Sequence, residues 1–208
     1  MTIAIIDYGM GNLRSVEKAF HHAGAQSAFV TSDPALIEAA DKAVLPGDGA
    51  FDSTVLSLRD SGIERVVKSF AASGRPLLGI CIGMQAMLTL SEEGEPGITG
   101  LDLIPGRVRR FGSSSSMGEK LSVPQIGWNT LFKRGDSVLL AGLAPKAWVY
   151  CLHSYYCVPD DQSVVVGEVE YGVPYCAVAE RGNLYATQFH PEKSGDAGQT
   201  IIRNFIAI

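Results

Sequence analysis

The chain has 208 residues, of which 46% are hydrophobic and 19% are charged. This length and composition predict a sizeable buried core and a single domain that spans residues 1–208. The formal net charge of -5 argues against nucleic acid or an anionic membrane as the main partner, because both require concentrated Lys and Arg.

The start of the chain and its cysteines indicate a cytoplasmic protein. The segment MTIAIIDYGMGN has no basic leader, so we expect no signal peptide, and no segment has the roughly 20 apolar residues that a membrane helix needs. The chain has four cysteines: Cys81, Cys151, Cys157 and Cys176. None forms a CxxC pair, so we expect thiols in a reducing compartment and neither a disulfide framework nor a metal site.

The first half of the chain alternates short apolar runs with helical patterns, which predicts a parallel sheet flanked by helices. The expected strands cover residues 2–6, 28–30, 42–45 and 76–80, and the expected helices cover residues 13–23 and about 52–73. Asp33 followed by Pro34 predicts a further helix start, and Gly62 predicts a break in the longer helical region. Because the run 76–80 is wholly apolar, we place it in the centre of the sheet.

The second half predicts strands joined by tight turns, at residues 149–152, 164–169, 176–179 and 184–188, and a last helix over residues 196–207. Residues 107–110, RVRR, form a dense basic cluster. Since Arg107 and Arg109 alternate with Val108, a strand with one solvated face explains them better than a phosphate site does. The four serines in residues 112–118 indicate a surface loop. The sequence therefore predicts an α/β fold with a mostly parallel central sheet, flanking helices and antiparallel additions in the second half.

The most informative segment is residues 77–85, where an apolar strand runs into the pattern G-x-C-x-G and then into a helix-forming stretch. This pattern is typical of a nucleophile elbow, here with Cys81 as the nucleophile. Gly79 and Gly83 leave room for neighbouring backbone around a strained turn. A helix N-terminus supplies partial positive charge and free amides, which favour a thiolate. A free cysteine is more often a buried structural residue, but this context favours the nucleophile.

A thiol nucleophile needs a base, and the chain offers four histidines: His21, His22, His153 and His190. His21 and His22 lie near the end of the first expected helix, where we expect them to be solvated. In an extended segment residues two apart point the same way, roughly 7 Å apart, so Glu192 can orient the imidazole of His190. The pattern H-x-E is weak alone, but with the elbow it predicts a triad. Cys81, His190 and Glu192 are then the nucleophile, the base and the orienting acid.

An acyl-transfer site must also stabilise an oxyanion, normally with backbone amides. The amide of Ile82, directly after the nucleophile, is one candidate donor. A second lies in residues 46–49, PGDG, which follow the preceding strand and can approach the elbow from its side. The alternative for PGDG is an ordinary tight turn. Its place at the carboxyl end of a parallel strand favours a site.

These motifs resemble those of the class I glutamine amidotransferases, which join a G-x-C-x-G-x-Q elbow to a late H-P-E. Here they are residues 79–85 and 190–192. Further segments are similar to the glutaminase subunits of imidazole glycerol phosphate synthases: DYGMGNL at residues 7–13, LPGDGAF at 45–51, IGWN at 126–129, HSYY at 153–156 and QFHPEKS at 188–194. The matches run from the first expected strand to the last. The implied fold is flavodoxin-like.

The resemblance implies that Cys81 forms a thioester with L-glutamine, which water hydrolyses to glutamate. The ammonia would pass to a cyclase subunit for imidazole ring formation in L-histidine biosynthesis. That partner is a TIM barrel in this family, and the two subunits form a heterodimer. No metal or organic cofactor is implied.

The resemblance also implies roles for further residues. Asp48 and Ile82 would occupy the oxyanion-hole positions, and Gln85 and Glu93 would contact the glutamine. Four residues would lie toward the cyclase: Asn12, Trp128, Tyr150 and Lys193. Two of these residues have a simpler alternative: Trp128 could pack in the core, and Lys193 could be a solvated side chain.

Two positions depart from the family pattern. The family usually has a small apolar residue at the position of Asp48, where an inward carboxylate would oppose the developing negative charge. Our hypothesis is that this carboxylate points away and only the backbone amide serves the site. The family often has His at the position of Gln125, so no interface role of that histidine carries over to this chain.

Three other functions remain open on the residues alone. A class I amidotransferase that serves another ammonia acceptor would share the triad, and residues 8–13 and 126–129 argue against it. A stand-alone cysteine hydrolase or peptidase would act without a partner and would not need Gln85. A non-enzymatic subunit that merely keeps the fold would not need an intact triad.

Overall fold

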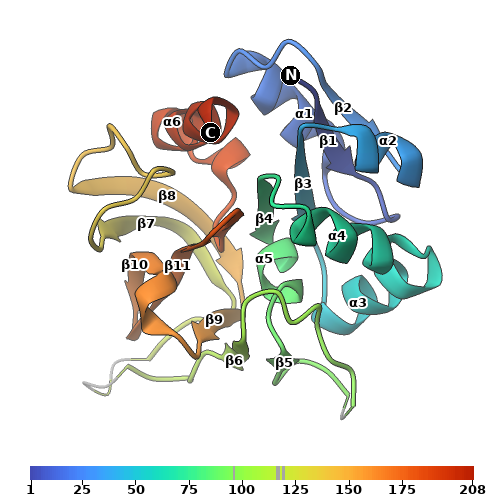
Figure 1. Cartoon of the computed structure of the whole chain (residues 1–208). Helices are drawn as coiled ribbons and strands as arrows, with labels where there is room; N and C mark the ends of the chain where they lie inside the picture. Colours follow the sequence, from blue (N-terminus) through green and yellow to red (C-terminus); the bar gives the residue numbers. More distant parts are fainter. Residues whose placement is uncertain (96, 116–117, 119) are drawn as a thin grey trace.

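The computed structural model describes residues 1–95, 97–115, 118 and 120–208 (Figure 1). Its parallel strands are, in spatial order, β2 (Ala28–Thr31), β1 (Ile3–Ile6), β3 (Lys42–Gly47), β4 (Leu77–Cys81) and β12 (Leu184–Thr187). Neighbours in this series pair in parallel. β4 is completely buried and lies between β3 and β12, so its predicted place inside the sheet is confirmed.

The sheet continues from β12 in antiparallel pairing with β11 (Val173–Arg181), β10 (Val165–Tyr171), β7 (Gln125–Lys133) and β8 (Lys146–His153). Three more strands branch from it: β5 (Leu90–Ser91), β6 (Gly106–Arg110) and β9 (Tyr155–Pro159). The antiparallel additions in the second half are confirmed, whereas β5, β7 and β9 were not predicted from the sequence.

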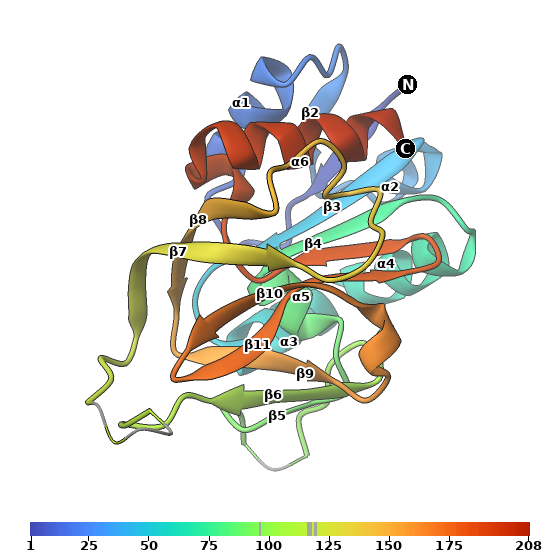
Figure 2. The same cartoon turned by 90° about the vertical axis from the view of Figure 1, so that its left-hand side faces the viewer.

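Helices cover both faces of the parallel strands (Figures 1 and 2). α1 (Leu13–His22) and α6 (Gly195–Ala207) lie on one face, and α2 (Pro34–Ala39), α3 (Phe51–Asp60) and α4 (Ile63–Ala72) lie on the other. The alternation of β1 explains this, because Ile3 and Ile5 pack with Phe20 and Phe205 while Ile6 packs on the opposite side. The short elements are α5 (Ile82–Ala86) and the 3-10 turns η1 (Gln162–Val164) and η2 (Pro191–Lys193).

Local predictions for the element ends are confirmed. The carboxylate of Asp33 caps α2 by accepting a hydrogen bond from the amide of Ala35 at 2.8 Å. Gly62 has φ 74° and separates α3 from α4. β6 is a strand with alternately buried and exposed residues at its start, as RVRR predicted. Of the predicted surface loop, residues 116 and 117 lie outside the described part of the chain.

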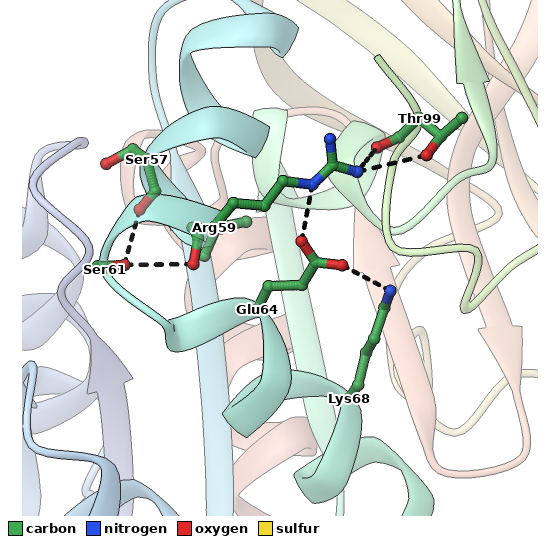
Figure 3. A network of polar contacts seen from close by, with 7 residues as sticks. Ser57, Arg59, Ser61, Glu64, Lys68 and Thr99 are labelled. Atoms are coloured by element: carbon green, nitrogen blue, oxygen red, sulfur yellow. Dashed lines mark hydrogen bonds and ion pairs between the residues drawn. The ribbon is translucent and has the colours of Figure 1, made fainter. Parts of the chain in front are cut away.

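An ion-pair network joins α3 to α4 and to a later loop (Figure 3). Glu64 accepts hydrogen bonds from Arg59 Nε at 2.8 Å and from Lys68 Nζ at 2.6 Å, and Arg59 Nη2 donates to the carbonyl of Thr99 at 2.6 Å. Burial would raise the pKa of Glu64, but these hydrogen bonds lower it. Such partly exposed pairs contribute little stability each, about 0–1 kcal/mol. The network therefore mainly fixes the position of α3 relative to α4 and to the loop at Thr99.

A buried lysine ties the last helix to the sheet. Lys42 begins β3 and is only 4% exposed. Its Nζ donates hydrogen bonds to the carbonyls of Phe205 at 2.9 Å and Ile206 at 2.7 Å. These carbonyls lie in the last turn of α6, where a helix has unpaired acceptors and a negative partial charge. The ammonium group therefore gives these helix carbonyls a hydrogen-bond donor, and the carbonyls give the buried ammonium its acceptors.

We predict that Lys42→Met destabilises the fold by about 1–3 kcal/mol, because the buried carbonyl of Phe205 and the partly buried carbonyl of Ile206 lose their donor. Urea unfolding followed by circular dichroism measures this, with the exposed Lys18→Met in α1 as the control. Equal unfolding midpoints for the two variants would show that the Lys42 hydrogen bonds add no stability.

Candidate active site

Cys81 lies on the strained turn that the sequence predicts. It is the last residue of β4 and the N-cap of α5, and its backbone has φ 56°. Residues other than glycine rarely adopt a positive φ, and such strain is typical of a nucleophile elbow. The side chain is 2% exposed, at the carboxyl end of a strand in the parallel part of the sheet.

Glycines allow the backbone to close around this turn. A Cβ at Gly83 would lie 1.9 Å from the carbonyl oxygen of Leu45, and one at Gly79 would lie 2.5 Å from Met87 Sδ. A Cβ at Gly47 would lie 2.6 Å from the amide nitrogen of Gly83. The end of β3 and the PGDG segment are therefore packed directly against the elbow, as the sequence predicts.

The structure brings His190 and Glu192 close to Cys81. His190 Nδ1 and Glu192 Oε1 are 2.8 Å apart, and both side chains are almost completely buried. His190 Nε2 has no hydrogen-bond partner among the described residues. Burial alone would lower the pKa of His190, but its interactions with Cys81 and Glu192 outweigh burial and raise the pKa to about 10. Since Glu192 occupies Nδ1, the free Nε2 is the nitrogen that can exchange a proton with Cys81.

A cavity of about 210 Å³ opens beside the elbow. It is lined by residues from several distant segments: Asp48, Gly49, Cys81, Ile82, Gln85, Glu93, Pro124, Leu152, His153, Ser154 and Tyr155. The cavity thus unites the predicted nucleophile with the residues predicted for the oxyanion hole and for substrate contact. Their roles stay predictions, but their shared location fits them.

Two of the lining residues offer hydrogen-bond acceptors. Gln85 is completely buried, and its Nε2 donates to the carbonyl of Tyr155 at 3.2 Å and to Gln188 Oε1 at 3.3 Å. Its Oε1 has no partner among the described residues. Glu93 Oε2 accepts a hydrogen bond from the amide of Phe51 at 2.8 Å, and burial raises the pKa of Glu93. A ligand with N–H donors would satisfy these groups.

A protein-family model described as "Glutamine amidotransferase class-I" matches residues 4–208. The chain belongs to this family. The predicted family and the predicted enzyme class, a glutamine amidotransferase, are thereby confirmed.

Two relatives illustrate which branch of the family is similar. "Imidazole glycerol phosphate synthase subunit HisH" of Syntrophotalea carbinolica is 49% identical, over 98% of this chain and 98% of the relative. The protein of the same name from Methanothermobacter thermautotrophicus is 50% identical, over 99% of this chain and 98% of the relative. This identity over nearly the whole length places the chain among the HisH subunits.

Solved structures share the fold at lower sequence identity. A crystal structure of a glutamine amidotransferase has a TM-score of 0.75 and 19% identity, and the match covers 100% of this chain and 98% of the other. PurLQS from Thermotoga maritima has a TM-score of 0.73 and 18% identity, with 99% of this chain and 97% of the other covered. The predicted fold class, that of a class I glutamine amidotransferase, is confirmed.

The four residues predicted to face a partner lie near the loop of His190 or at the start of α1. Trp128 is 52% exposed, which excludes the alternative that it packs in the core. The centroids of its ring and of the Tyr150 ring are 5.9 Å apart. The carbonyl of Tyr150 accepts a hydrogen bond from the amide of His190, and the amide of Lys193 donates to the carbonyl of His190. Asn12 is exposed and caps α1.

Sequence reasoning missed part of the cavity wall. His153, Ser154 and Tyr155 line it, although the segment HSYY was assigned no role. The resemblance carried by this segment was the one pattern that could have marked it. Gln125 is 1% exposed and lies 3.0 Å from the hydroxyl of Tyr175. This chain therefore uses the position in its interior rather than at an interface.

The described residues contain no helix of the length and apolarity that crossing a membrane would require. The expected absence of a metal and of a cofactor stays a prediction.

We predict that Glu192→Gln lowers the pKa of His190 by about one unit or more, because a neutral amide stabilises the imidazolium less than a carboxylate does. The pKa of about 10 lies above the ordinary value, so the protonated ring is lost as the pH rises. In the variant this loss must occur at lower pH.

NMR titration of the His190 ring measures the shift directly, and the high-pH limb of glutamate release should move with it. The exposed Glu38→Gln in α2 is the matched control. An unchanged His190 titration in Glu192→Gln would remove Glu192 as the orienting acid.

Proposed function

We propose that this chain is the glutaminase subunit of an imidazole glycerol phosphate synthase. It hydrolyses L-glutamine to glutamate and passes the ammonia to a cyclase subunit, in which the imidazole ring forms during L-histidine biosynthesis. The observation that supports this proposal is the interaction of His190 with Cys81, which itself lines the cavity, in a chain 49–50% identical to HisH subunits. The cysteines, all thiols, fit a cytoplasmic location.

The proposed reaction begins with attack of the Cys81 sulfur on the side-chain amide carbon of glutamine. The carbonyl oxygen becomes an oxyanion, for which the backbone amides of Asp48 and Ile82 are the proposed donors. His190, protonated beside Cys81, gives its Nε2 proton to the amide nitrogen as the C–N bond breaks. Ammonia leaves, and the acyl group remains on sulfur as a thioester.

Hydrolysis of the thioester reuses the same imidazole. Nε2 of His190, now neutral, takes a proton from water as the water oxygen attacks the acyl carbon. The C–S bond breaks, glutamate leaves, and the thiolate and imidazolium are restored. Throughout the reaction, His190 Nδ1 donates its hydrogen bond to Glu192 Oε1, with the two atoms 2.8 Å apart. This bond keeps Nε2 directed at the reacting atoms.

The cavity suits the free amino acid rather than a peptide glutamine. Glu93 and the unpaired Oε1 of Gln85 are acceptors that fit the α-ammonium group of L-glutamine. A peptide-bound glutamine has an acylated nitrogen with only one N–H, so it satisfies fewer acceptors. This supports a glutaminase over a peptidase.

An exposed apolar surface next to the site supports a partner. Trp128, Trp148 and Ile126 on β7 and β8 are 52%, 61% and 61% exposed. Exposed large apolar side chains that lie together are typical of protein interfaces, and Trp is enriched at their energetic centres. We propose that this surface, with Asn12, Tyr150 and Lys193, faces the TIM-barrel cyclase in a heterodimer, although the alternative of another ammonia acceptor shares the same triad.

We predict that the cyclase subunit with its nucleotide ligand stimulates glutamate release by about 10-fold or more, a size common for coupled sites. A synthase that gates its glutaminase wastes little ammonia. The measurement is glutamate release by the chain alone, with the cyclase, and with cyclase and ligand.

Cys81→Ala should reduce glutamate release to background in each condition, whereas Cys176→Ala, outside the cavity, should retain it. Full activity of the chain alone would favour a stand-alone hydrolase. Stimulation only by a different acceptor enzyme would favour another amidotransferase.

We predict that Asp48→Val changes the stimulated kcat by less than about threefold, because an exposed carboxylate is screened by water and leaves the backbone amide in place. Parallel measurement of Asp48→Asn separates charge from size. A gain of about 100-fold, the size of an oxyanion-hole effect, would mean that the carboxylate points into the site.

A further inference from the structure

A chain of buried polar groups runs behind the cavity and ends at the carbonyl of Tyr155. His153, the last residue of β8, pairs across the sheet with Gln125, the first residue of β7. The hydroxyl of Tyr175 lies 3.0 Å from the amide group of Gln125 and 3.3 Å from His153 Nε2. His153 Nδ1 lies 2.8 Å from the carbonyl oxygen of Tyr155. All three side chains are at most 5% exposed.

Counting donors and acceptors fixes the direction of the hydrogen bonds among these buried groups. The carbonyl of Tyr155 can only accept, so His153 Nδ1 carries a proton. Burial lowers the pKa of His153 to about 4, so the ring is neutral and Nε2 is an acceptor that faces the hydroxyl of Tyr175 at 3.3 Å. The same hydroxyl donates to Gln125 Oε1 at 3.0 Å, so the Gln125 oxygen and His153 Nε2 are both acceptors that face one hydroxyl group.

The carbonyl of Tyr155 connects these buried hydrogen bonds to a residue of the cavity wall. Besides the proton of His153, it accepts one from Gln85 Nε2 at 3.2 Å. The second Nε2 proton of Gln85 goes to Gln188. Both donors of the Gln85 amide are thus used, and the oxygen is the end left unpaired in a residue that lines the cavity.

His153 itself lines the cavity, but both of its nitrogens have protein partners. It therefore has no free nitrogen to serve as a base, and what it contributes is the position of the Tyr155 carbonyl. Without the proton of His153, this carbonyl could turn, and the Gln85 amide would lose the acceptor that decides which of its ends is free.

We propose that His153 is a positioning residue for glutamine, which fixes the Tyr155 carbonyl so that the Gln85 amide keeps its oxygen available for the substrate's α-ammonium. The inference rests on the proposed glutaminase function. It assigns to one imidazole nitrogen, Nδ1, a task that the other nitrogen cannot perform.

Two substitutions separate the nitrogens. His153→Asn places an amide N–H near the position of Nδ1 and should keep the KM for glutamine within about threefold of the natural protein. His153→Gln places its amide near the position of Nε2 and loses the bond to Tyr155. Its KM should rise about tenfold, the loss of one hydrogen bond, with a smaller change in kcat. The exposed His22→Gln in α1 is the control.

A second readout uses glutaramate, which is glutamine without its α-ammonium group. The preference for glutamine over glutaramate, as a ratio of kcat/KM values, should fall in His153→Gln and persist in His153→Asn. If His153→Gln does not fold, Tyr175→Phe gives the test, because it keeps the Nδ1 bond and should preserve that preference.

Equal KM values for the Asn and Gln variants, or a lost preference in Tyr175→Phe, would overturn the proposal. Failure of the natural chain with its cyclase to release glutamate from glutamine would instead overturn the proposed function. The two failures are therefore distinguishable.

Discussion

The site depends on the parallel pairing of β4 with β12. β4 ends at Cys81, and β12 leads within a few residues to His190, so side-by-side strands in one direction deliver both residues to the same edge of the sheet. The pairing of Ala186 with Gly79 and of Thr187 with Ile80 fixes this register. A slip of one residue would turn alternate side chains to the wrong face, and Cys81 would then be separated from His190.

The parallel half of the fold and the closeness of the three proposed triad residues could be predicted because their patterns are local. The elbow needs only a wholly apolar strand and two glycines around Cys81, and the orienting acid is two residues from its histidine. Even the break between α3 and α4 is marked by a single glycine, Gly62, at positive φ.

The antiparallel half was harder to predict because its patterns are not those of buried strands. β7 exposes large apolar residues such as Trp128 and Phe132, which hides the usual alternation of polar and apolar positions. β9 follows β8 after Ser154 alone, with no glycine or proline to mark the turn. Tyr155 meets Gln85 across 70 positions of sequence, a contact that no local pattern encodes.

The ammonium group of Lys42 also determines how α6 can detach from the sheet during partial unfolding. Because it is buried against the last carbonyls of α6, the helix cannot lift from the sheet without leaving a charge and two acceptors unpaired in an apolar setting. Partial detachment of the helix is thereby made costly, and α6 and β3 should open as one cooperative unit. Slow hydrogen exchange in the final helix would then report on the stability of the sheet that carries Cys81.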